Sequence, residues 1–210
     1  MPNVPAQRVF LWALLVACLV ALAVATIWVR RNAAPSPAAS GLPELFAVPD
    51  FSLVGHDGKA VARRDLAGSP WIASFIFTRC GGVCPLIVES LKRLEPALAR
   101  HPDVARVSIT VDPEYDTPAV MAEYARAHGV GDLAQSRWHF LTGPPQAVRD
   151  LILHGFKMAL AAGATPEEPI LHSTRLVLVD GQGMIRGLYE YDDPAAIARL
   201  EHDLDLVSRR

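Results

Sequence analysis

The feature that most constrains this chain is an apolar run that leads directly into two closely spaced cysteines. Residues 71–77 are almost wholly apolar, with β-branched and aromatic members, as is typical of a buried strand. Cys80 and Cys84 follow in a Cys-x-x-x-Cys spacing, and the two glycines between them interrupt regular structure. The stretch therefore predicts a buried strand that ends in a loop carrying two thiols.

A helix is expected directly after the second cysteine. Pro85 suits the first helical position, where its missing N–H costs nothing. Pro96 lies inside the helical pattern, and we expect it to kink or end the helix early. The apolar face of this helix repeats at helical spacing and consists of Ile87, Leu91, Leu94 and Leu98.

The position of Cys84 at a helix N-terminus has a chemical consequence. Unpaired N–H groups and the helix dipole stabilise a thiolate there, and the thiolate is the form that binds soft metals and attacks disulfides. Two sulfurs this close could be bridged, or could both face one metal ion. A structural disulfide, or two buried thiols that never react, is the alternative. A crosslink over so short a loop adds little stability, so a chemical use is favoured.

A second apolar run lies near the N-terminus. Residues 10–29 carry no charge, and about 20 such residues match the length of a helix that spans a bilayer. Arginines flank the run, and tryptophans lie near both of its ends, as interfacial anchors do. We therefore expect a single transmembrane anchor, with residues 1–9 in the cytoplasm and the two cysteines outside, where disulfides persist. A cleaved signal peptide and lipidation at Cys18 are the alternatives.

The remainder divides into a linker and a folded domain. Residues 30–44 are rich in alanine and proline without periodicity, which predicts a semi-extended linker. Residues 45–210 are numerous enough to bury a substantial core. The net charge of -2 gives no indication of a nucleic-acid partner.

Strand and helix patterns alternate along the folded domain. Helical patterns begin near residues 85, 118, 148 and 194, and residues 156–170 are expected to form a long irregular connection. This order predicts an α/β fold with a mixed central sheet and helices on both faces. With a dithiol at the first strand-to-helix junction, the architecture is thioredoxin-like, behind a single N-terminal transmembrane helix. The strand patterns lie at 51–54, 59–61, 71–77, 105–111, 138–141, 173–179 and 184–189.

Three motifs follow one another through this domain. They are Phe-Thr-Arg-Cys-Gly-Gly-Val-Cys-Pro at 77–85, Val-Asp-Pro-Glu-Tyr-Asp-Thr-Pro at 111–118, and His-Ser at 172–173, which runs into a strand and Asp-Gly. In these motifs the chain resembles the Sco/SenC family of copper-binding assembly factors for cytochrome c oxidase, over nearly the whole folded domain. One departure is Gly81, where the family commonly has proline after the first cysteine.

The resemblance implies a metal site. It implies that one copper ion, Cu(I) or Cu(II), is held by Cys80, Cys84 and His172, and that the two cysteines are a redox-active pair that closes to a disulfide when oxidised. The ligand types agree with this, because thiolates suit Cu(I) and imidazole suits either oxidation state. The other histidines have no such context and are expected to be solvated or structural: His56, His101, His128, His139, His154 and His202.

Two carboxylates are further candidates at the same sheet edge. Asp112 and Asp116 surround a turn at the end of a strand. They are read either as a surface for partner recognition or a weak outer ligand, or as ordinary turn and capping residues. The turn interpretation is favoured for Asp116, and the two interpretations are balanced for Asp112.

The implied function is a copper chaperone anchored in the inner membrane and facing the periplasm, or the intermembrane space in a eukaryote. It would assist assembly of the dinuclear copper centre of cytochrome c oxidase subunit II, with other copper chaperones or thiol–disulfide reductases as further partners. The alternative is a thiol–disulfide oxidoreductase that reduces the cysteines of that subunit. A thiol peroxidase on the same fold is a third candidate. Peroxiredoxins place a threonine three residues before the reactive cysteine, whereas Thr78 is two before Cys80.

Overall fold

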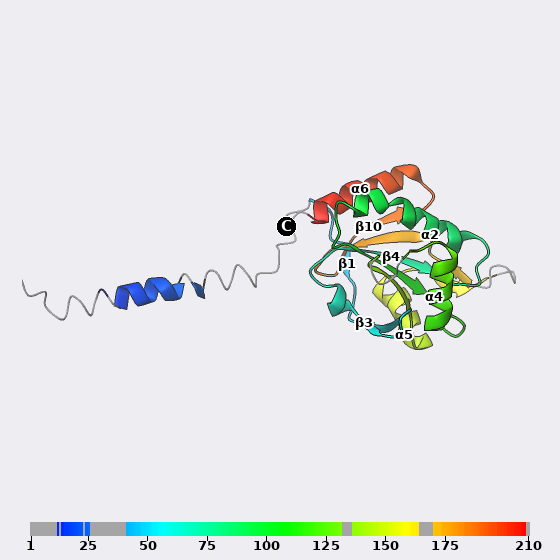
Figure 1. Cartoon of the computed structure of the whole chain (residues 1–210), viewed down its shortest axis with the longest axis horizontal. Coiled ribbons are helices and arrows are strands. Elements are labelled where there is room, and N and C mark those ends of the chain that lie inside the picture. The colour runs from blue at the N-terminus through cyan, green and yellow to red at the C-terminus, as the bar shows by residue number, and fades with distance from the viewer. Residues whose placement is uncertain are drawn as a thin grey trace, which may run out of the picture. The chain divides into compact units, whose positions relative to one another are not determined.

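The computed structural model of this chain describes residues 12, 14–22, 24–25, 41–131, 136–163 and 170–208. The chain forms two compact units, Met1–Ala39 and Ser40–Arg210. In the first, residues 14–22 are helical and exposed (Figure 1). Within the described ranges, no helix is long and apolar enough to cross a membrane. The expected anchor at 10–29 and linker at 30–44 both extend beyond those ranges, so the anchor stays a prediction.

The second unit is built on one mixed sheet, seen near its centre in Figure 1 as β4 and β10. Among the described residues the strand order is β1-β10-β9-β4-β5-β6-β2-β3, with β4, β5 and β6 parallel and the other pairings antiparallel. The strands are β1 (Phe46–Ala47), β2 (Ser52–Gly55), β3 (Ala60–Ala62), β4 (Trp71–Ile76), β5 (Ala105–Thr110), β6 (Trp138–Thr142), β9 (Arg175–Val179) and β10 (Met184–Glu190).

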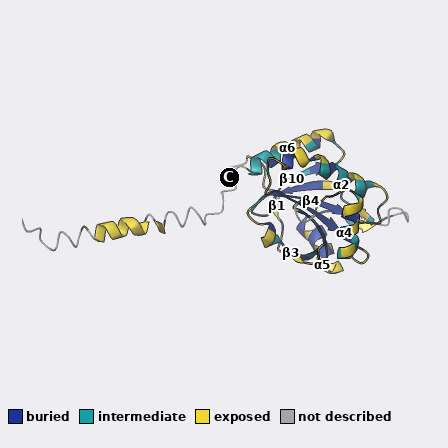
Figure 2. Cartoon of the chain, in the orientation of Figure 1, coloured by how far each residue is buried: buried dark blue, intermediate teal, exposed yellow. Residues whose placement is uncertain are grey.

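Helices cover this sheet. α2 packs against β4, α4 against β6 and α6 against β10. Every residue of β4 and of β5 is buried, so both faces of the sheet centre are covered (Figure 2), as the sequence predicts. The helical elements are η2 (Arg63–Leu66), α2 (Val83–Arg93), α3 (Glu95–Leu98), α4 (Pro118–Ala127), α5 (Pro145–Asp150), the π-helical turn η3 (Leu151–Gly155) and α6 (Pro194–Ser208).

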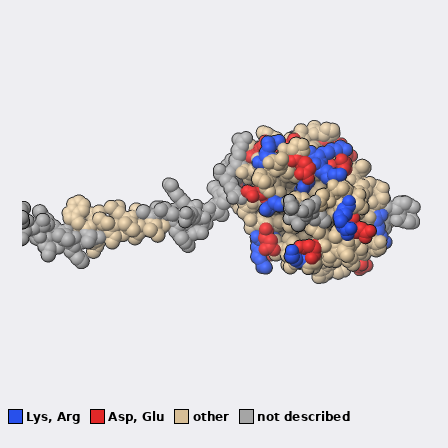
Figure 3. All heavy atoms as spheres, in the orientation of Figure 1, with Lys and Arg blue, Asp and Glu red and all other residues tan. Residues whose placement is uncertain are grey.

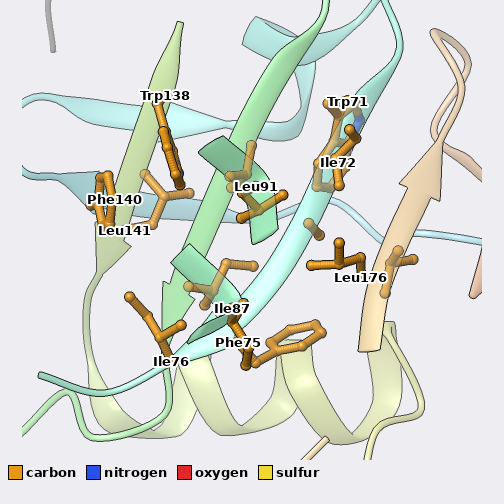
Figure 4. Packing of buried hydrophobic residues seen from close by; sticks show 14 of the residues in the cluster. Trp71, Ile72, Phe75, Ile76, Ile87, Leu91, Trp138, Phe140, Leu141 and Leu176 are labelled. Carbon is orange, nitrogen blue, oxygen red and sulfur yellow. The ribbon is translucent and has the colours of Figure 1, made fainter. Parts of the chain in front are cut away.

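Large apolar side chains from the sheet and its helices form one core. Ile87 and Leu91 project from α2 into the cluster that contains Phe75 of β4 (Figure 4). Phe156, directly after the π-helical turn, packs edge-on against Phe75 at 5.1 Å and against Trp71 at 6.0 Å between ring centroids. The core therefore fixes the strand that leads into the cysteine loop.

Two expectations about local structure need correction. The cysteine helix begins at Val83 and not at Pro85, while Pro96 does break it, because a separate short helix α3 contains that proline. The described part of the connection expected to be irregular at 156–170 contains regular structure. Its strand β7 (Leu160–Ala162) pairs antiparallel with β8 (Ile170–His172), and Leu160 lies opposite His172. Three-residue strands are too short to show a periodic pattern in the sequence.

A buried polar chain crosses the middle of the sheet. Ser108 of β5 accepts the indole N–H of Trp138 at 3.0 Å, and its hydroxyl lies 2.9 Å from that of Ser74 on β4. Both serines are fully buried. These hydrogen bonds satisfy buried polar side chains that would otherwise be left unpaired between the strands.

We expect Ser108→Ala to lower the free energy of unfolding of the second unit by about 1–3 kcal/mol, because it leaves the Trp138 N–H and the Ser74 hydroxyl without their shared partner. Urea unfolding followed by tryptophan fluorescence measures this. Ser52→Ala, at an exposed position on β2, is the control and should change stability by no more than about 0.5 kcal/mol. Equal effects from the two variants would contradict the assignment.

Candidate metal centre

Both cysteines lie at the carboxyl end of β4. Cys80 is in the loop after this strand, and Cys84 is the second residue of α2, whose N-cap is Gly82. The loop is held close to the helix, because the backbone N–H of Cys84 donates to the Cys80 sulfur at 3.5 Å. Cys80 and Cys84 are both free thiols and both buried. The structure thus brings the two predicted sulfur ligands together at the start of a helix.

His172 reaches the same place from β8. Its Nε2 lies 3.6 Å from the Cys84 sulfur, and its Nδ1 lies 2.9 Å from the backbone oxygen of Ser173. A carbonyl oxygen only accepts, so Nδ1 carries the proton and Nε2 presents its lone pair to the Cys84 thiol. The Phe77 ring packs edge-on against the imidazole at 5.7 Å between centroids. The histidine therefore has its ring orientation fixed and its free nitrogen aimed at sulfur, as in a metal ligand with an oriented second nitrogen.

A small cavity lies between the cysteine loop and the β8 strand. Its volume is about 210 Å³, and mostly apolar side chains line it. A low-dielectric wall of this kind strengthens electrostatic interactions at the site. The lining residues are Phe77, Cys80, Val83, Ile170, Leu171, His172 and Thr174.

The protonation of Cys84 differs from the expectation of a thiolate. Burial raises the pKa of the Cys84 thiol far above its ordinary value, although the hydrogen bond from the Phe77 N–H, at 3.5 Å, acts in the opposite direction. The loss of solvation on burial therefore outweighs the stabilisation that the helix N-terminus would give to a thiolate. In this reduced state the thiol donates to His172 Nε2, so a metal ion that binds both atoms would replace the proton they share.

The predicted three-ligand set is only partly assembled. Among the described residues, no group of three or more His, Cys, Asp or Glu side chains is already arranged to hold a metal ion. The close contacts run in pairs, from Cys80 to Cys84 and from Cys84 to His172. A metal ion bound by all three residues would therefore draw Cys80 and His172 toward a common point beside Cys84.

Asp116 is not the ordinary turn residue that the sequence favours. Its side chain is fully buried. It accepts a hydrogen bond from the backbone N–H of Thr78 at 3.2 Å and one from the Thr78 hydroxyl. The Thr110 hydroxyl at the end of β5 donates to Oδ2, which also accepts the Thr78 N–H, while the Thr78 hydroxyl donates to Oδ1. Burial raises the pKa of Asp116, and the hydrogen bonds from the threonines act against that rise. The helix cap is the next residue, Thr117, whose hydroxyl accepts from the Val120 N–H at 3.4 Å.

Asp112 forms the neighbouring contact nearer the surface. It pairs with the guanidinium of Arg79, whose Nε lies 3.1 Å from the carboxylate. The same guanidinium stacks over the ring of Tyr115 at 4.6 Å. The Asp112 carboxylate is therefore paired with Arg79 of the cysteine loop and does not bond to either sulfur. The sequence pattern does not indicate that Thr78 and Thr110 bind Asp116, although the position of Thr78 two residues before Cys80 is visible in the sequence.

The other histidines lie elsewhere. His101 pairs with Asp205 at 2.6 Å, and the N–H of Phe140 donates to His56 at 3.4 Å. Burial lowers the pKa of His56 and of His139. His154 is exposed and lies 4.0 Å from Asp150. None of these contacts involves a cysteine, which agrees with a structural or solvated role.

The family is identified by comparison with known proteins. The SCO1/SenC family model matches residues 42–204. A SCO1 protein homolog of Bacillus subtilis is 32% identical over 159 residues, which cover 72% of this chain and 80% of that protein. The chain also matches mitochondrial SCO2 homologs, of whose length it spans about half. These matches cover the domain that contains the cysteines and His172.

Solved structures agree with the sequence matches. BsSco, described as a member of the Sco family of cytochrome c oxidase assembly proteins with a disulfide switch, is 28% identical. It aligns with a TM-score of 0.68 over 80% of this chain and 96% of that one. Bradyrhizobium japonicum ScoI, solved with copper bound, is 24% identical with a TM-score of 0.63, over 75% and 99% of the two chains, and shows the shared fold. The thioredoxin-like α/β fold expected from the sequence is thereby confirmed, and the chain belongs to the SCO1/SenC family.

Proposed function

We propose that this protein is a membrane-anchored copper chaperone that binds one copper ion through Cys80, Cys84 and His172. It assists assembly of the dinuclear copper centre of cytochrome c oxidase subunit II. The observation that carries this proposal is the 3.6 Å contact between the Cys84 sulfur and His172 Nε2, two soft-metal donors from distant parts of the chain. The naming of related proteins as copper-bound and as cytochrome c oxidase assembly factors supports it.

The donor set suits an ion that must be both held and released. Two thiolates satisfy low-coordinate Cu(I), and a neutral imidazole is an acceptable third ligand in either oxidation state. The metal must displace thiol protons, and the raised pKa of Cys84 makes this displacement costly. We infer that copper is cargo at this site, bound by soft ligands whose protonation works against permanent retention.

Exposed apolar side chains on elements that adjoin the site support delivery to a protein partner. Leu86 of α2, Tyr115 in the loop after β5 and Leu171 beside His172 are each about half exposed. Large exposed apolar groups near a functional site are typical of interaction surfaces. On the face seen in Figure 3, acidic and basic side chains are interspersed, with no broad field of one sign. This supports a protein partner such as subunit II over a nucleic acid.

A thiol–disulfide oxidoreductase acting on the same subunit is the second candidate. The contact between the Cys84 N–H and the Cys80 sulfur favours it, because two neighbouring thiols can pass two electrons and two protons to a partner disulfide and close on each other. Closing the pair removes both sulfur ligands, so the two activities exclude each other at any one moment. A peroxidase is disfavoured, because the Thr78 hydroxyl is engaged as a donor to Asp116.

Copper binding should require the reduced pair. We expect the reduced full-length protein in detergent to bind one copper ion, and prior oxidation of Cys80 and Cys84 to a disulfide, or alkylation of either thiol, to abolish binding. The measurement is copper titration followed by absorbance and paramagnetic resonance. Cys18→Ala is the control and should bind like the parent. Unchanged affinity in fully oxidised protein would place the site elsewhere.

His172 should matter more for Cu(II) than for Cu(I). Two thiolates alone hold Cu(I), whereas Cu(II) prefers a tetragonal site with nitrogen or oxygen donors. Without the imidazole, the thiolates should reduce Cu(II) and end as a disulfide. We expect His172→Ala to keep most Cu(I) binding while the thiolate-to-copper charge-transfer band bleaches quickly after stoichiometric Cu(II) is added. His154→Ala is the matched control, and identical band lifetimes in both variants and the parent would remove His172 from the site.

We also propose that the protein is a single-pass protein of the inner membrane, with residues 10–29 as the anchor and the copper domain in the periplasm. The uncharged run with flanking arginines supports this. A tag placed after Arg210 should then be digested by protease added to intact spheroplasts, while a cytoplasmic marker survives. A tag that resists digestion until the cells are lysed would contradict this topology.

A further inference from the structure

We propose that Asp116 is a positioning residue for the cysteine loop, which it holds through Thr78, two residues after the end of β4. This inference rests on the proposed function, because it concerns how Cys80 is placed for that function. Asp116 touches neither sulfur, and its effect would pass through Arg79, the one residue between Thr78 and Cys80.

The contacts of Asp116 join two loops that are distant in sequence. Thr78 offers both its backbone N–H and its hydroxyl to the carboxylate. Thr110, the last residue of β5, donates its hydroxyl to Oδ2, the oxygen that also accepts the Thr78 N–H, and accepts the Asp112 N–H at 2.9 Å. The Asp116 N–H donates to the Asp112 backbone oxygen at 2.9 Å. The carboxylate is therefore fixed by the β5 loop and in turn fixes the cysteine loop.

The cysteine loop depends on this anchor for its shape. The turn itself contains one internal hydrogen bond, from the Cys80 N–H to the Phe77 oxygen at 3.2 Å. The glycines that follow Cys80 impose no conformation of their own. Gly81 has open space where a side chain would lie, and no neighbouring atom comes within 4 Å of that point. Apart from the more exposed Arg79–Asp112 pair, the Asp116–Thr78 contact is thus the tertiary restraint nearest to Cys80 on its N-terminal side.

The two contacts on this loop differ in burial. Arg79, which pairs with Asp112, has a side chain that is 49% exposed, so that ion pair is screened by solvent and contributes little. Asp116 is fully buried. A buried carboxylate held by several donors is costly to disturb, because the loss of one partner leaves charge or hydroxyl groups unpaired. We therefore assign the positioning of Cys80 mainly to Asp116.

Asp116 also carries charge close to the sulfurs, and two variants separate charge from position. Asp116→Asn removes the charge and disturbs the contacts with both threonines. Thr78→Val removes only one hydroxyl donor and keeps the charge. If position dominates, both variants act in the same direction. If charge dominates, only Asp116→Asn changes the two readouts. It should then favour thiolate formation and metal binding, because a nearby anion disfavours negative charge on either sulfur.

The test is the dithiol–disulfide equilibrium of the metal-free, full-length protein with glutathione. Oxidised glutathione takes two electrons and two protons from Cys80 and Cys84 and leaves as two reduced molecules while the new S–S bond forms. The fraction closed gives the effective concentration of one thiol at the other, which is a direct measure of position. All samples carry Cys18→Ala, so that only two thiols remain. Cu(I) affinity, measured by competition with a chelator, is the second readout.

We expect Asp116→Asn and Thr78→Val each to lower the effective concentration and the Cu(I) affinity, with a tenfold or larger loss for Asp116→Asn, as for other residues that orient metal ligands. Tyr189→Phe is the matched control. It breaks a hydrogen bond from a buried tyrosine to Asp203 at 2.7 Å, between β10 and α6. It should lower the melting temperature and leave both readouts at the parent value.

Two results would overturn the inference. One is that Asp116→Asn and Thr78→Val show the same effective concentration of one thiol at the other as Tyr189→Phe. Asp116 would then stabilise the fold without positioning Cys80. The other is tighter binding in Asp116→Asn with no change in Thr78→Val, which would leave only a charge effect. A parent that binds no Cu(I) would instead overturn the proposed function, while the glutathione equilibrium would still decide the role of Asp116.

Discussion

The parallel pairing of β4 with β5 is the constraint on which the site depends. Parallel strands bring their carboxyl ends to one edge of the sheet, so the loop with the cysteines and the loop with Asp112 and Asp116 emerge side by side. β9 runs antiparallel to β4, and its first residue therefore lies at the same edge. His172 shortly precedes β9 and reaches the cysteines for that reason. Three segments far apart in the sequence meet because of strand direction alone.

Burial and the helix N-terminus have opposite effects on the pKa of Cys84. The first turn of α2 offers N–H groups that favour a thiolate, yet Cys84 is completely enclosed and burial raises its pKa. The thiol proton is shared with His172 in place of being lost to solvent. In the proposed copper site, a soft metal ion would satisfy both atoms without leaving a buried charge unpaired.

The sequence predicted most of the fold, and the structure brings the predicted site residues Cys80, Cys84 and His172 together in close pairs. Periodic strands and helical patterns were visible, including the start of α4 at residue 118. The β7–β8 hairpin was not predicted, because its strands are short and half exposed. The role of Asp116 was misjudged, because an aspartate at the end of a turn gives the same sequence signal whether its carboxylate faces water or two threonines of the fold. Contacts between loops of different strands follow from topology, which the local pattern does not encode.

The central claim is that two sulfurs and one imidazole meet on a single copper ion. X-ray absorption at the copper edge, on the loaded full-length protein in detergent, tests this most directly. The account predicts scattering from two sulfur neighbours together with the outer-shell pattern of one imidazole ring, and loss of that ring pattern in His172→Ala alone. A first shell of nitrogen and oxygen only, or an imidazole pattern that persists in His172→Ala, would contradict it.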